Sequence, residues 1–481
     1  MLKNTVYNIV KTLSTMVFPL ITFPYIARVL GVENLGKINF GNSIVNYFSL
    51  IATLGIVVYA IRECSKVRDD KETLSEIASQ IFSINLCMTV VSYIILGFLL
   101  YFGKSLESYR TLIIIQSTII VLTTLGADWI NTVLEDFKYI TYRTLFFQLF
   151  SLVAMLIFVR HTKDYLIYAA IMTIASGGGN ICNIIYRRKY CKIVFTLKMS
   201  MIRHFIPIIT MFALVLSQTV FTNLDMTMIG LFRGDVEVGL YSIAMKIYNV
   251  TNTTVASIVY VVLPQLSTYY KTYDYININK ILSYSLNYII LLGLPLITGL
   301  NVMAKEIVII IGGKEYVDAA ITLRILTAAL LFSLIGGFIG NIIFMSSGRE
   351  KIALMASVVA ALANGISNLM LIPKFGYNAA AMTTVLAELI SVIVLVGKVE
   401  KKIKTKSIWS MLKCPAIGSV SIGLICISLK YMIRIFWLKT VLCIICSIIV
   451  YGLTLIIGKD EFALNAIAPI KEKIKRFKRI E

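Results

Sequence analysis

Charged side chains are scarce in this sequence. Lysine, arginine, aspartate and glutamate make up 15% of the 481 residues, whereas 58% are hydrophobic and the mean hydropathy is +0.84. Soluble globular proteins carry about 25% charged residues. So few polar groups cannot cover a body that is dissolved in water. The composition therefore excludes a soluble protein and makes lipid the solvent.

Two further absences narrow the architecture. The sequence lacks the strict two-residue alternation of barrel strands and instead contains apolar stretches of about 20 residues, the length that crosses a bilayer as a helix. Long loops are also absent, because the longest connections, near 187–203 and 398–412, hold only about fifteen residues. No soluble domain is expected. We therefore predict an all-α polytopic membrane protein.

Fourteen spans are predicted from the apolar stretches. Their approximate ranges are 6–30, 38–61, 75–101, 110–134, 139–159, 165–186, 204–232, 238–263, 281–311, 318–346, 352–372, 376–397, 412–429 and 438–457.

The distribution of basic residues predicts the orientation of the chain. Of the 46 lysines and arginines, thirty fall on one side of the spans, thirteen on the other and three inside spans. Basic loops stay in the cytoplasm, so both termini are expected there, in agreement with an even number of spans. The first span is too long for a cleavable signal peptide and lacks a small-residue cleavage site.

The two halves of the chain resemble each other. The segment "GVENLG" at 31–36 follows the first span, and "GDVEVG" at 234–239 follows the seventh. Six spans separate the copies, so both halves have the same orientation, as in transporters built from parallel repeats around a central cavity. This predicts an N-terminal six-helix lobe at 1–200 and a C-terminal six-helix lobe at 201–400. Two additional helices and a basic cytoplasmic tail follow at 401–481.

Charge and cysteine usage exclude other classes of protein. The net charge of +21 comes from basic residues beside the spans, including the tail "KEKIKRFKRIE" at 471–481. This distribution favours contact with anionic lipid head groups over binding of nucleic acid. Cys443 and Cys446 form a CxxC, but inside one span and without a second pair, which is typical of small apolar packing residues. No metal site is predicted.

We single out one ionisable residue in each of six predicted spans. They are Lys11, Asp128, Asp225, Lys246, Arg324 and Glu388, with Arg28 at the end of the first span. A charge inside a membrane helix usually pairs with another charge or lines water. For Lys11, near the cytoplasmic end, snorkelling to the head groups and cavity lining are equally good interpretations. Asp128 also lies near a cytoplasmic end, which favours local capping or pairing.

Asp225, Lys246 and Arg324 need a different explanation. Asp225 is too short to reach the head groups, and all three lie in the outer half of their spans, as Arg28 does. Side chains at one depth on separate helices can converge on one polar chamber, so we expect a cationic cavity with Asp225 as its counter-charge. A purely structural ion pair between Asp225 and Lys246 is the rival interpretation. Glu388, in mid-span, is a candidate for ion coupling or for structural pairing.

Several stretches together resemble one family of membrane transporters. They are "FPYIARVLGVENLG" at 23–36, "LEDFKYITYR" at 134–143, "NLDMTMIG" at 223–230, "VGLYSIAMKIYN" at 238–249, "VLPQLS" at 262–267, "GGKEYVDAAITLRIL" at 312–326 and "NLMLIPKFGYNAAAMTTVLAE" at 368–388. In combination they are similar to the polysaccharide flippases, the Wzx-type proteins of the polysaccharide transporter family. This family belongs to the multidrug/oligosaccharidyl-lipid/polysaccharide exporter superfamily. The resemblance covers the first twelve predicted spans.

The resemblance implies a fold, a substrate and a location. The fold is two six-helix lobes around a central cavity. The substrate is an undecaprenyl-pyrophosphate-linked oligosaccharide repeat unit, turned from the cytoplasmic to the outer leaflet of the bacterial inner membrane for O-antigen or capsule synthesis. By motif position, Arg28, Lys246 and Arg324 would be cavity cations and Asp225 their counter-charge.

Lys11 is a further candidate cation in this scheme, and Glu388 a further candidate for coupling to a proton or sodium gradient. Lysine and arginine suit the pyrophosphate because they combine charge with several hydrogen-bond donors. Membrane lipids, a polysaccharide polymerase and glycosyltransferases of the same pathway are the expected partners. No bond is broken, so no catalytic residue or cofactor is required.

Rival functions come from the same superfamily and from a different class. A small-molecule exporter would favour an apolar, acid-lined cavity, whereas flippases for teichoic acid or peptidoglycan precursors share the head-group chemistry. A membrane glycosyltransferase or polymerase usually needs a sizeable external loop with catalytic acids. No predicted outer loop exceeds about a dozen residues. The sequence therefore predicts a transporter and not an enzyme.

Overall fold

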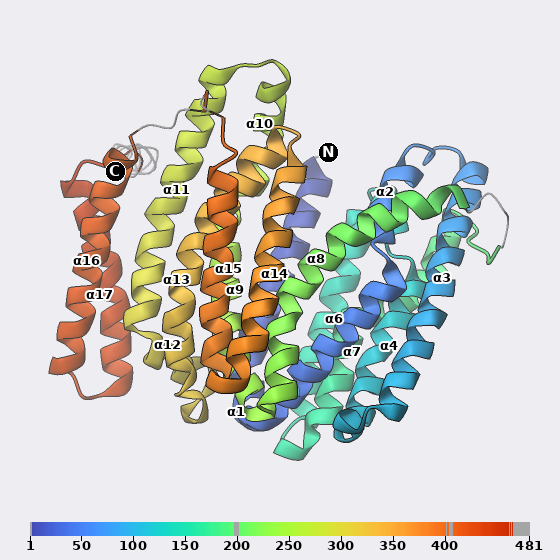
Figure 1. Ribbon diagram of the computed structural model, residues 1–481, viewed down its shortest axis with the longest axis horizontal. Helices are drawn as coiled ribbons and strands as arrows, with labels where there is room; N and C mark the ends of the chain where they lie inside the picture. The colour runs from blue at the N-terminus through green and yellow to red at the C-terminus, as the bar shows by residue number, and fades with distance from the viewer. Residues whose placement is uncertain are drawn as a thin grey trace, which may run out of the picture. The chain divides into compact units, whose positions relative to one another are not determined.

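The computed structural model describes residues 2–196, 202–400, 402–403, 407–460, 462 and 464, and every regular element in these ranges is a helix (Figure 1). The predicted all-α class is confirmed. The predicted basic tail at 471–481 lies outside the described residues. The chain divides into two compact units. Unit 1 comprises Met1–Ser242, Ile311–Glu315 and Ile372–Tyr377, and unit 2 comprises Ile243–Ile310, Tyr316–Leu371 and Asn378–Glu481.

Eleven helices within the described residues are long and apolar enough to cross a membrane, so the protein is a multi-pass membrane protein. One of the eleven, Val6–Ser65, contains the first two predicted spans. The chain reverses there within α1 (Leu2–Thr53), at Gly31, whose φ of 74° is not helical. Gly234, its counterpart in the second repeat, has a φ of 92°. The count of fourteen spans stays a prediction.

Unit 1 is built mainly from the first eight α-helices. After α1 come α2 (Ile56–Ser65), α3 (Lys71–Phe102), η1 (Lys104–Tyr109), α4 (Arg110–Gly126), α5 (Trp129–Val133), α6 (Phe137–Phe158), η2 (Thr162–Asp164), α7 (Tyr165–Tyr186), η3 (Arg187–Lys189), α8 (Ile202–Phe232) and the start of α9 (Asp235–Ala256).

Two predicted spans of unit 1 are broken helices. The span at 38–61 breaks at Leu54 and Gly55, and the span at 110–134 breaks at Ala127, where φ is positive in each case. Hydrophobic length alone does not reveal such breaks, because the apolar run continues across them. Irregular backbone at membrane depth is tolerated where it is buried in protein or lines a cavity.

Buried polar side chains connect the helices of unit 1. The Asn85 amide of α3 donates a hydrogen bond of 2.7 Å to the carbonyl of Ala52, which closes the C-terminal end of α1. The Ser92 hydroxyl donates to the carbonyl of Phe48 at 2.7 Å. Such contacts between helices favour association in lipid, where apolar burial provides little driving force.

The two repeat turns of unit 1 meet at backbone contact. A methyl group on Gly36 would overlap the carbonyl oxygen of Asp235, and a methyl group on Gly239 would overlap the carbonyl oxygen of Val32. Residues 32 and 36 are related to 235 and 239 by the same offset along the chain, so each contact is the copy of the other. This reciprocal packing supports the predicted repeat. We call this contact between residues 32, 36, 235 and 239 the glycine crossing.

Unit 2 contains the remaining helices. They are the rest of α9, α10 (Ile258–Lys271), α11 (Tyr275–Val302), α12 (Ala304–Gly312, which unit 2 shares with unit 1), η5 (Lys314–Tyr316, also shared), α13 (Ala319–Gly337), the π-helix η6 (Phe338–Phe344), α14 (Glu350–Phe375), α15 (Tyr377–Val396), α16 (Ile408–Met432) and α17 (Phe436–Ile457).

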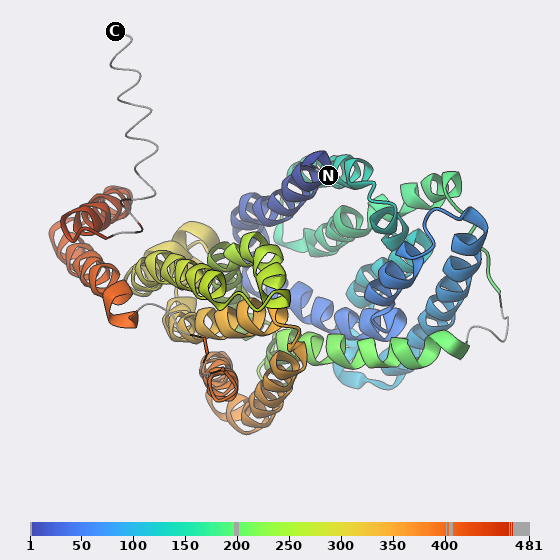
Figure 2. The same ribbon diagram turned by 90° about the horizontal axis from the view of Figure 1, so that it is seen from above.

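The last two helices form a hairpin that packs on α11. Figures 1 and 2 show α16 and α17 side by side, and α16 also packs against α11. The hydroxyl of Tyr451 donates a hydrogen bond of 2.6 Å to the carbonyl of Leu291, which ties α17 to α11. The hairpin is therefore an integral part of unit 2.

Candidate functional site

Unit 1 contains a polar pocket of about 380 Å³ between α1, α6 and α7, beside the break between α4 and α5. Charged and hydrogen-bonding side chains make up much of its wall. The polar members used below are Lys11, Thr15, Asp128, Arg143, Thr144, Gln148 and Ser176. A volume of this size falls within the range of small-molecule sites, roughly 300 to 1,000 Å³. We call this cavity the polar pocket.

The break after α4 brings Asp128 to the polar pocket. Ala127 ends α4 in the left-handed region, with a φ of 45°, and α5 starts two residues later. The carbonyl of Gly126 that the break leaves open accepts a hydrogen bond of 2.6 Å from the buried Asn183 amide. The Asn131 amide donates in turn to Asn183, at 2.7 Å, and to the Asp128 carboxylate, at 3.0 Å. Two asparagines thus fix the broken backbone and the acid.

Arg143 is the partner of Asp128. Its guanidinium lies 2.7 Å from the Asp128 carboxylate, and the Arg143 side chain is 9% exposed, compared with 34% for Asp128. Gly179 of α7 makes room for this arginine, because a methyl group there would lie 2.7 Å from Nε of Arg143. The guanidinium also covers the ring of Tyr139, 5.3 Å from the ring centre. The local pairing expected for Asp128 is therefore present.

Lys11 adds a positive charge to the wall of the polar pocket. It forms no ion pair with a residue that the structure describes. Since Asp128 and Arg143 neutralise each other, the charged groups of the pocket have an excess of one positive charge. Lys11 thus lines a cavity, and its role as a substrate-binding cation stays a prediction.

The other predicted site residues of unit 1 lie away from the polar pocket. Arg28 is exposed on α1, three residues before the turn at Gly31. Asp225 of α8 is 5% exposed, and its carboxylate accepts a hydrogen bond from the fully buried hydroxyl of Tyr241. Burial and a tyrosine donor are compatible with a structural role as well as with a counter-charge.

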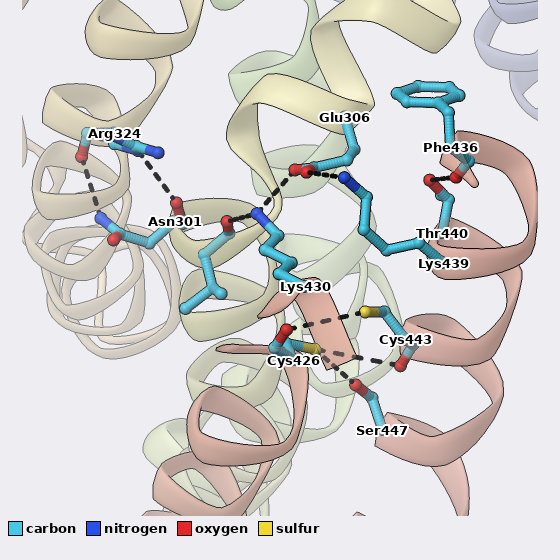
Figure 3. A network of polar contacts seen from close by, with 11 residues as sticks. Asn301, Glu306, Arg324, Cys426, Lys430, Phe436, Lys439, Thr440, Cys443 and Ser447 are labelled. Atoms are coloured by element: carbon cyan, nitrogen blue, oxygen red, sulfur yellow. Dashed lines mark hydrogen bonds and ion pairs between the residues drawn. The ribbon is translucent and has the colours of Figure 1, made fainter. Parts of the chain in front are cut away.

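Three predicted site residues belong to unit 2. Arg324 is exposed on α13, and its Nε donates to the carbonyl of Asn301 of α11 at 3.3 Å (Figure 3). Glu388 of α15 is partly buried and accepts a hydrogen bond of 3.3 Å from the Tyr248 hydroxyl of α9. Lys246 is partly buried on the same helix as Tyr248. Whether the six predicted residues act together stays a prediction.

A buried ion cluster in unit 2 was missed by the sequence analysis. Glu306 of α12 is 4% exposed and pairs with Lys430 of α16 at 2.7 Å and with Lys439 of α17 at 3.3 Å (Figure 3). The predicted span at 281–311 includes Glu306, and the two lysines flank the turn between the last two spans. The sequence contained a signal for this cluster. Glu306 lies inside one predicted span, and Lys430 and Lys439 lie at the ends of the last two predicted spans that face the same side of the membrane.

Arg143 was also missed, because it lies near the start of the predicted span at 139–159 and was counted among the basic residues of the cytoplasmic side. The structure buries it in the second turn of α6. Asp128 was the signal in the sequence for this arginine, because an acid inside a span usually pairs with a cation at a similar depth in the membrane.

Asp136 directly precedes α6 and lies outside the membrane-spanning helices. Its carboxylate accepts hydrogen bonds from the hydroxyls of Tyr186, at 2.6 Å, and Tyr190, at 2.9 Å, and from the Tyr139 amide, at 3.2 Å. Burial raises the pKa of Asp136, but these hydrogen bonds outweigh burial and hold the pKa below its usual range. This acid fixes the N-terminal end of α6, the helix that carries Arg143.

Comparisons with known proteins identify the relatives of the chain. It is 27% identical over 164 residues to the "Probable low-salt glycan biosynthesis flippase Agl15" of Haloferax volcanii, an alignment that spans 34% of each protein. It is 24% identical to the "Putative O-antigen transporter" of Shigella dysenteriae, over 80% of this chain and 96% of that protein.

Solved structures show a shared fold. The structure named "Lipid II flippase MurJ, inward closed conformation" superposes with a TM-score of 0.76 and 17% identity, over 95% of this chain and 99% of that one. The family model described as "Polysaccharide biosynthesis protein" matches residues 1–270, which is more than half of the 481 residues. The chain therefore belongs to the polysaccharide biosynthesis protein family. It shares its all-helical fold with the solved flippase structure named above.

Proposed function

We propose that the protein is a flippase that moves a lipid-linked oligosaccharide from the cytoplasmic to the outer leaflet of the bacterial inner membrane. The observation that carries the proposal is the polar pocket, a chamber with an excess of positive charge inside a bundle of membrane helices. The names of the relatives, a glycan biosynthesis flippase and an O-antigen transporter, support the same reading. The protein is a transporter and not an enzyme.

The physics of the substrate requires such a chamber. A pyrophosphate with several sugars cannot cross about 30 Å of hydrocarbon unaided, whereas a polyprenyl tail is at home there. A cavity that is open toward lipid can hold the head group while the tail stays outside. Rocking of two lobes would then expose the head group to the other side. In our proposal the lobes are 1–200 and 201–400, followed by the two additional helices and the basic cytoplasmic tail at 401–481.

The cations have a defined role in this proposal. Arg28, Lys246 and Arg324 bind the undecaprenyl-linked pyrophosphate, and Lys11 is a further substrate-binding cation in the polar pocket. Asp225 and Glu388 balance these charges or couple transport to a proton or sodium gradient. Arginine and lysine provide charge-assisted hydrogen bonds to phosphate oxygens. Both termini lie in the cytoplasm, and a polymerase and glycosyltransferases supply and consume the repeat unit, with O-antigen or capsule as the final product.

The test neutralises two cations in cells. In Lys246→Gln and Arg324→Gln, we expect surface polysaccharide to fall about tenfold or more per variant, since a lost charged hydrogen bond weakens binding by roughly 1.5 to 3 kcal/mol. The lipid-linked repeat unit should accumulate in the cytoplasmic leaflet. Lys104→Gln, on an exposed surface of η1, is the matched control. Undiminished export in both variants, at equal protein levels in the membrane, would contradict the proposal.

A further inference from the structure

We propose that the polar pocket of unit 1 is a sugar-binding subsite, which takes one or two sugar residues of the lipid-linked oligosaccharide. This inference rests on the proposed function and assigns the pocket to the sugars instead of the pyrophosphate. The site is formed by α1, α6, α7 and Asp128, all within unit 1.

The hydrogen-bonding groups of the pocket match hydroxyl groups. The hydroxyl of Thr15 donates its proton to the carbonyl of Thr12, at 2.8 Å, and the hydroxyl of Thr144 donates to the carbonyl of Ile140, also at 2.8 Å. A hydroxyl that has donated its proton can only accept further hydrogen bonds. The carboxylate of Asp128 is also an acceptor. These three side chains therefore present acceptors to the pocket, which suit the O–H donors of a sugar.

A phosphate would fit this wall poorly. Phosphate oxygens at neutral pH are mainly acceptors, so they gain no hydrogen bond from the two threonine oxygens or from the Asp128 carboxylate, whose charge Arg143 already balances. Arg143 is 9% exposed and engaged with Asp128, which leaves Lys11 as the one cation of the wall without a described ion pair. A single lysine supports binding of a sugar hydroxyl or of an acidic sugar more readily than binding of a pyrophosphate.

The remaining wall has the apolar surface that a sugar ring needs. Phe18 and Phe147 contribute aromatic rings from α1 and α6, and the Gln148 side chain contributes an amide with both donors and an acceptor. The volume of about 380 Å³ is too small for a whole repeat unit and the polyprenyl chain together. The pocket is therefore suited to recognise a part of the glycan, and we infer that it contributes to substrate specificity.

The first test removes hydrogen-bonding groups and keeps the shape of the wall. In the double variant Thr144→Val with Gln148→Met, we expect export of the cell's own glycan to fall about tenfold, since each lost hydrogen bond weakens binding by roughly 0.5 to 1.5 kcal/mol. Thr173→Val is the matched control, because Thr173 is a buried threonine of α7 that donates to the carbonyl of Ala169 and does not line the pocket. Normal export by the double variant, at normal protein level, would overturn the subsite.

The second test asks which part of the substrate occupies the pocket. Ser176 is exposed on the pocket wall, so Ser176→Cys should react with a water-soluble maleimide in inverted membrane vesicles, read by mass spectrometry at residue 176. We compare vesicles from cells that make the full lipid-linked glycan with vesicles from cells that lack the first glycosyltransferase. The latter are tested with and without added inorganic pyrophosphate.

Slower labelling by severalfold only where sugars are present would support the subsite. Equal protection by pyrophosphate alone would assign the pocket to phosphate and overturn it, as would equal labelling in all vesicles. In either case, a loss of export in Lys246→Gln would leave the flippase proposal standing. Full export in both Lys246→Gln and Arg324→Gln would instead contradict the flippase proposal, so the two failures can be distinguished.

Discussion

The glycine crossing and the polar pocket are two regions of unit 1 in which glycine has opposite effects on packing. At the crossing, Gly36 and Gly239 let two stretches of backbone touch, so no side chain and no space remain between them. At the pocket, Gly179 lets the Arg143 side chain lie flat on α7, and a cavity stays open beside it. The same residue type therefore closes one region and helps to keep another one open.

The comparison predicts different responses to an added methyl group. At the crossing the opposing atoms are backbone, which cannot rotate away. At the pocket the opposing atoms belong to a long side chain, which can shift by a few tenths of an ångström. An added methyl group should therefore cost more stability at the crossing than at the pocket. Only at the pocket should a second substitution, one that shortens the opposing side chain, restore the lost stability.

The largest effect is expected for Gly36→Ala. The methyl group would overlap the Asp235 carbonyl, so the two turns must separate, at the upper end of the range for overpacking, about 3 kcal/mol. Thermal unfolding of the purified protein in detergent measures the loss. Gly97→Ala in α3 is the control, because no heavy atom lies within 4 Å of the added group and alanine favours helix by up to about 1 kcal/mol. Equal unfolding temperatures for the two variants would refute the close contact.

A smaller effect is expected from breaking the ion pair of the pocket. Arg143→Gln should destabilise the protein by about 2 kcal/mol, because it removes a charged hydrogen bond while Asp128 keeps access to solvent through the pocket. Asp128→Asn should cost at least as much, since it leaves a buried guanidinium without its carboxylate. The double variant should be no worse than the worse single variant. Additive losses in this double-mutant cycle would mean that the two side chains do not interact.

Gly179→Ala should cost about 1 kcal/mol, because the Arg143 side chain can shift but loses some of its alignment with Asp128. The decisive measurement is the same substitution in the Arg143→Gln background. There the added methyl group faces a shorter side chain, and the loss should disappear. If the loss persists in that background, the steric contact with Arg143 is not its cause.

The smallest effect is expected at Asp136, which caps the N-terminal end of α6. Asp136→Asn should destabilise the protein by about 1 kcal/mol at pH 7, because a neutral amide accepts weaker hydrogen bonds from the hydroxyls of Tyr186 and Tyr190 than the carboxylate does. The folded-state pKa of Asp136 lies below its usual value, so its stabilisation is present above the usual pKa and is lost as the pH falls through the folded-state pKa. Unfolding temperatures of the two proteins should converge in acid. A difference that stays constant down to pH 2 would contradict this account.

Much of the fold follows from the sequence. The scarcity of charge and the apolar stretches predict a helical membrane protein, and the repeated turns at residues 31–36 and 234–239 predict two regions that the structure brings together in the glycine crossing. The breaks at Gly55 and Ala127 could not be predicted, because the hydrophobic run continues across them and the backbone turns over one or two residues.

The candidate site was predicted only in part. Charges inside spans drew attention to Lys11 and Asp128, but Arg143, near the start of the predicted span at 139–159, was counted with the cytoplasmic side. Span ends are uncertain by a few residues, and one helical turn decides whether an arginine is in water or buried. Pockets also depend on which helix faces meet, and a single sequence does not contain that information.

The cluster around Glu306 has a consequence for chains of different length. Lys430 and Lys439 act as counter-ions delivered by the terminal hairpin, and deleting that hairpin would strip a buried carboxylate of both. A shortened version of this protein would then have to tolerate an unneutralised anion in a low-dielectric surrounding or replace it. A chain truncated before residue 407 should therefore fold only if position 306 carries a neutral residue. The hairpin and Glu306 should accordingly be gained or lost together.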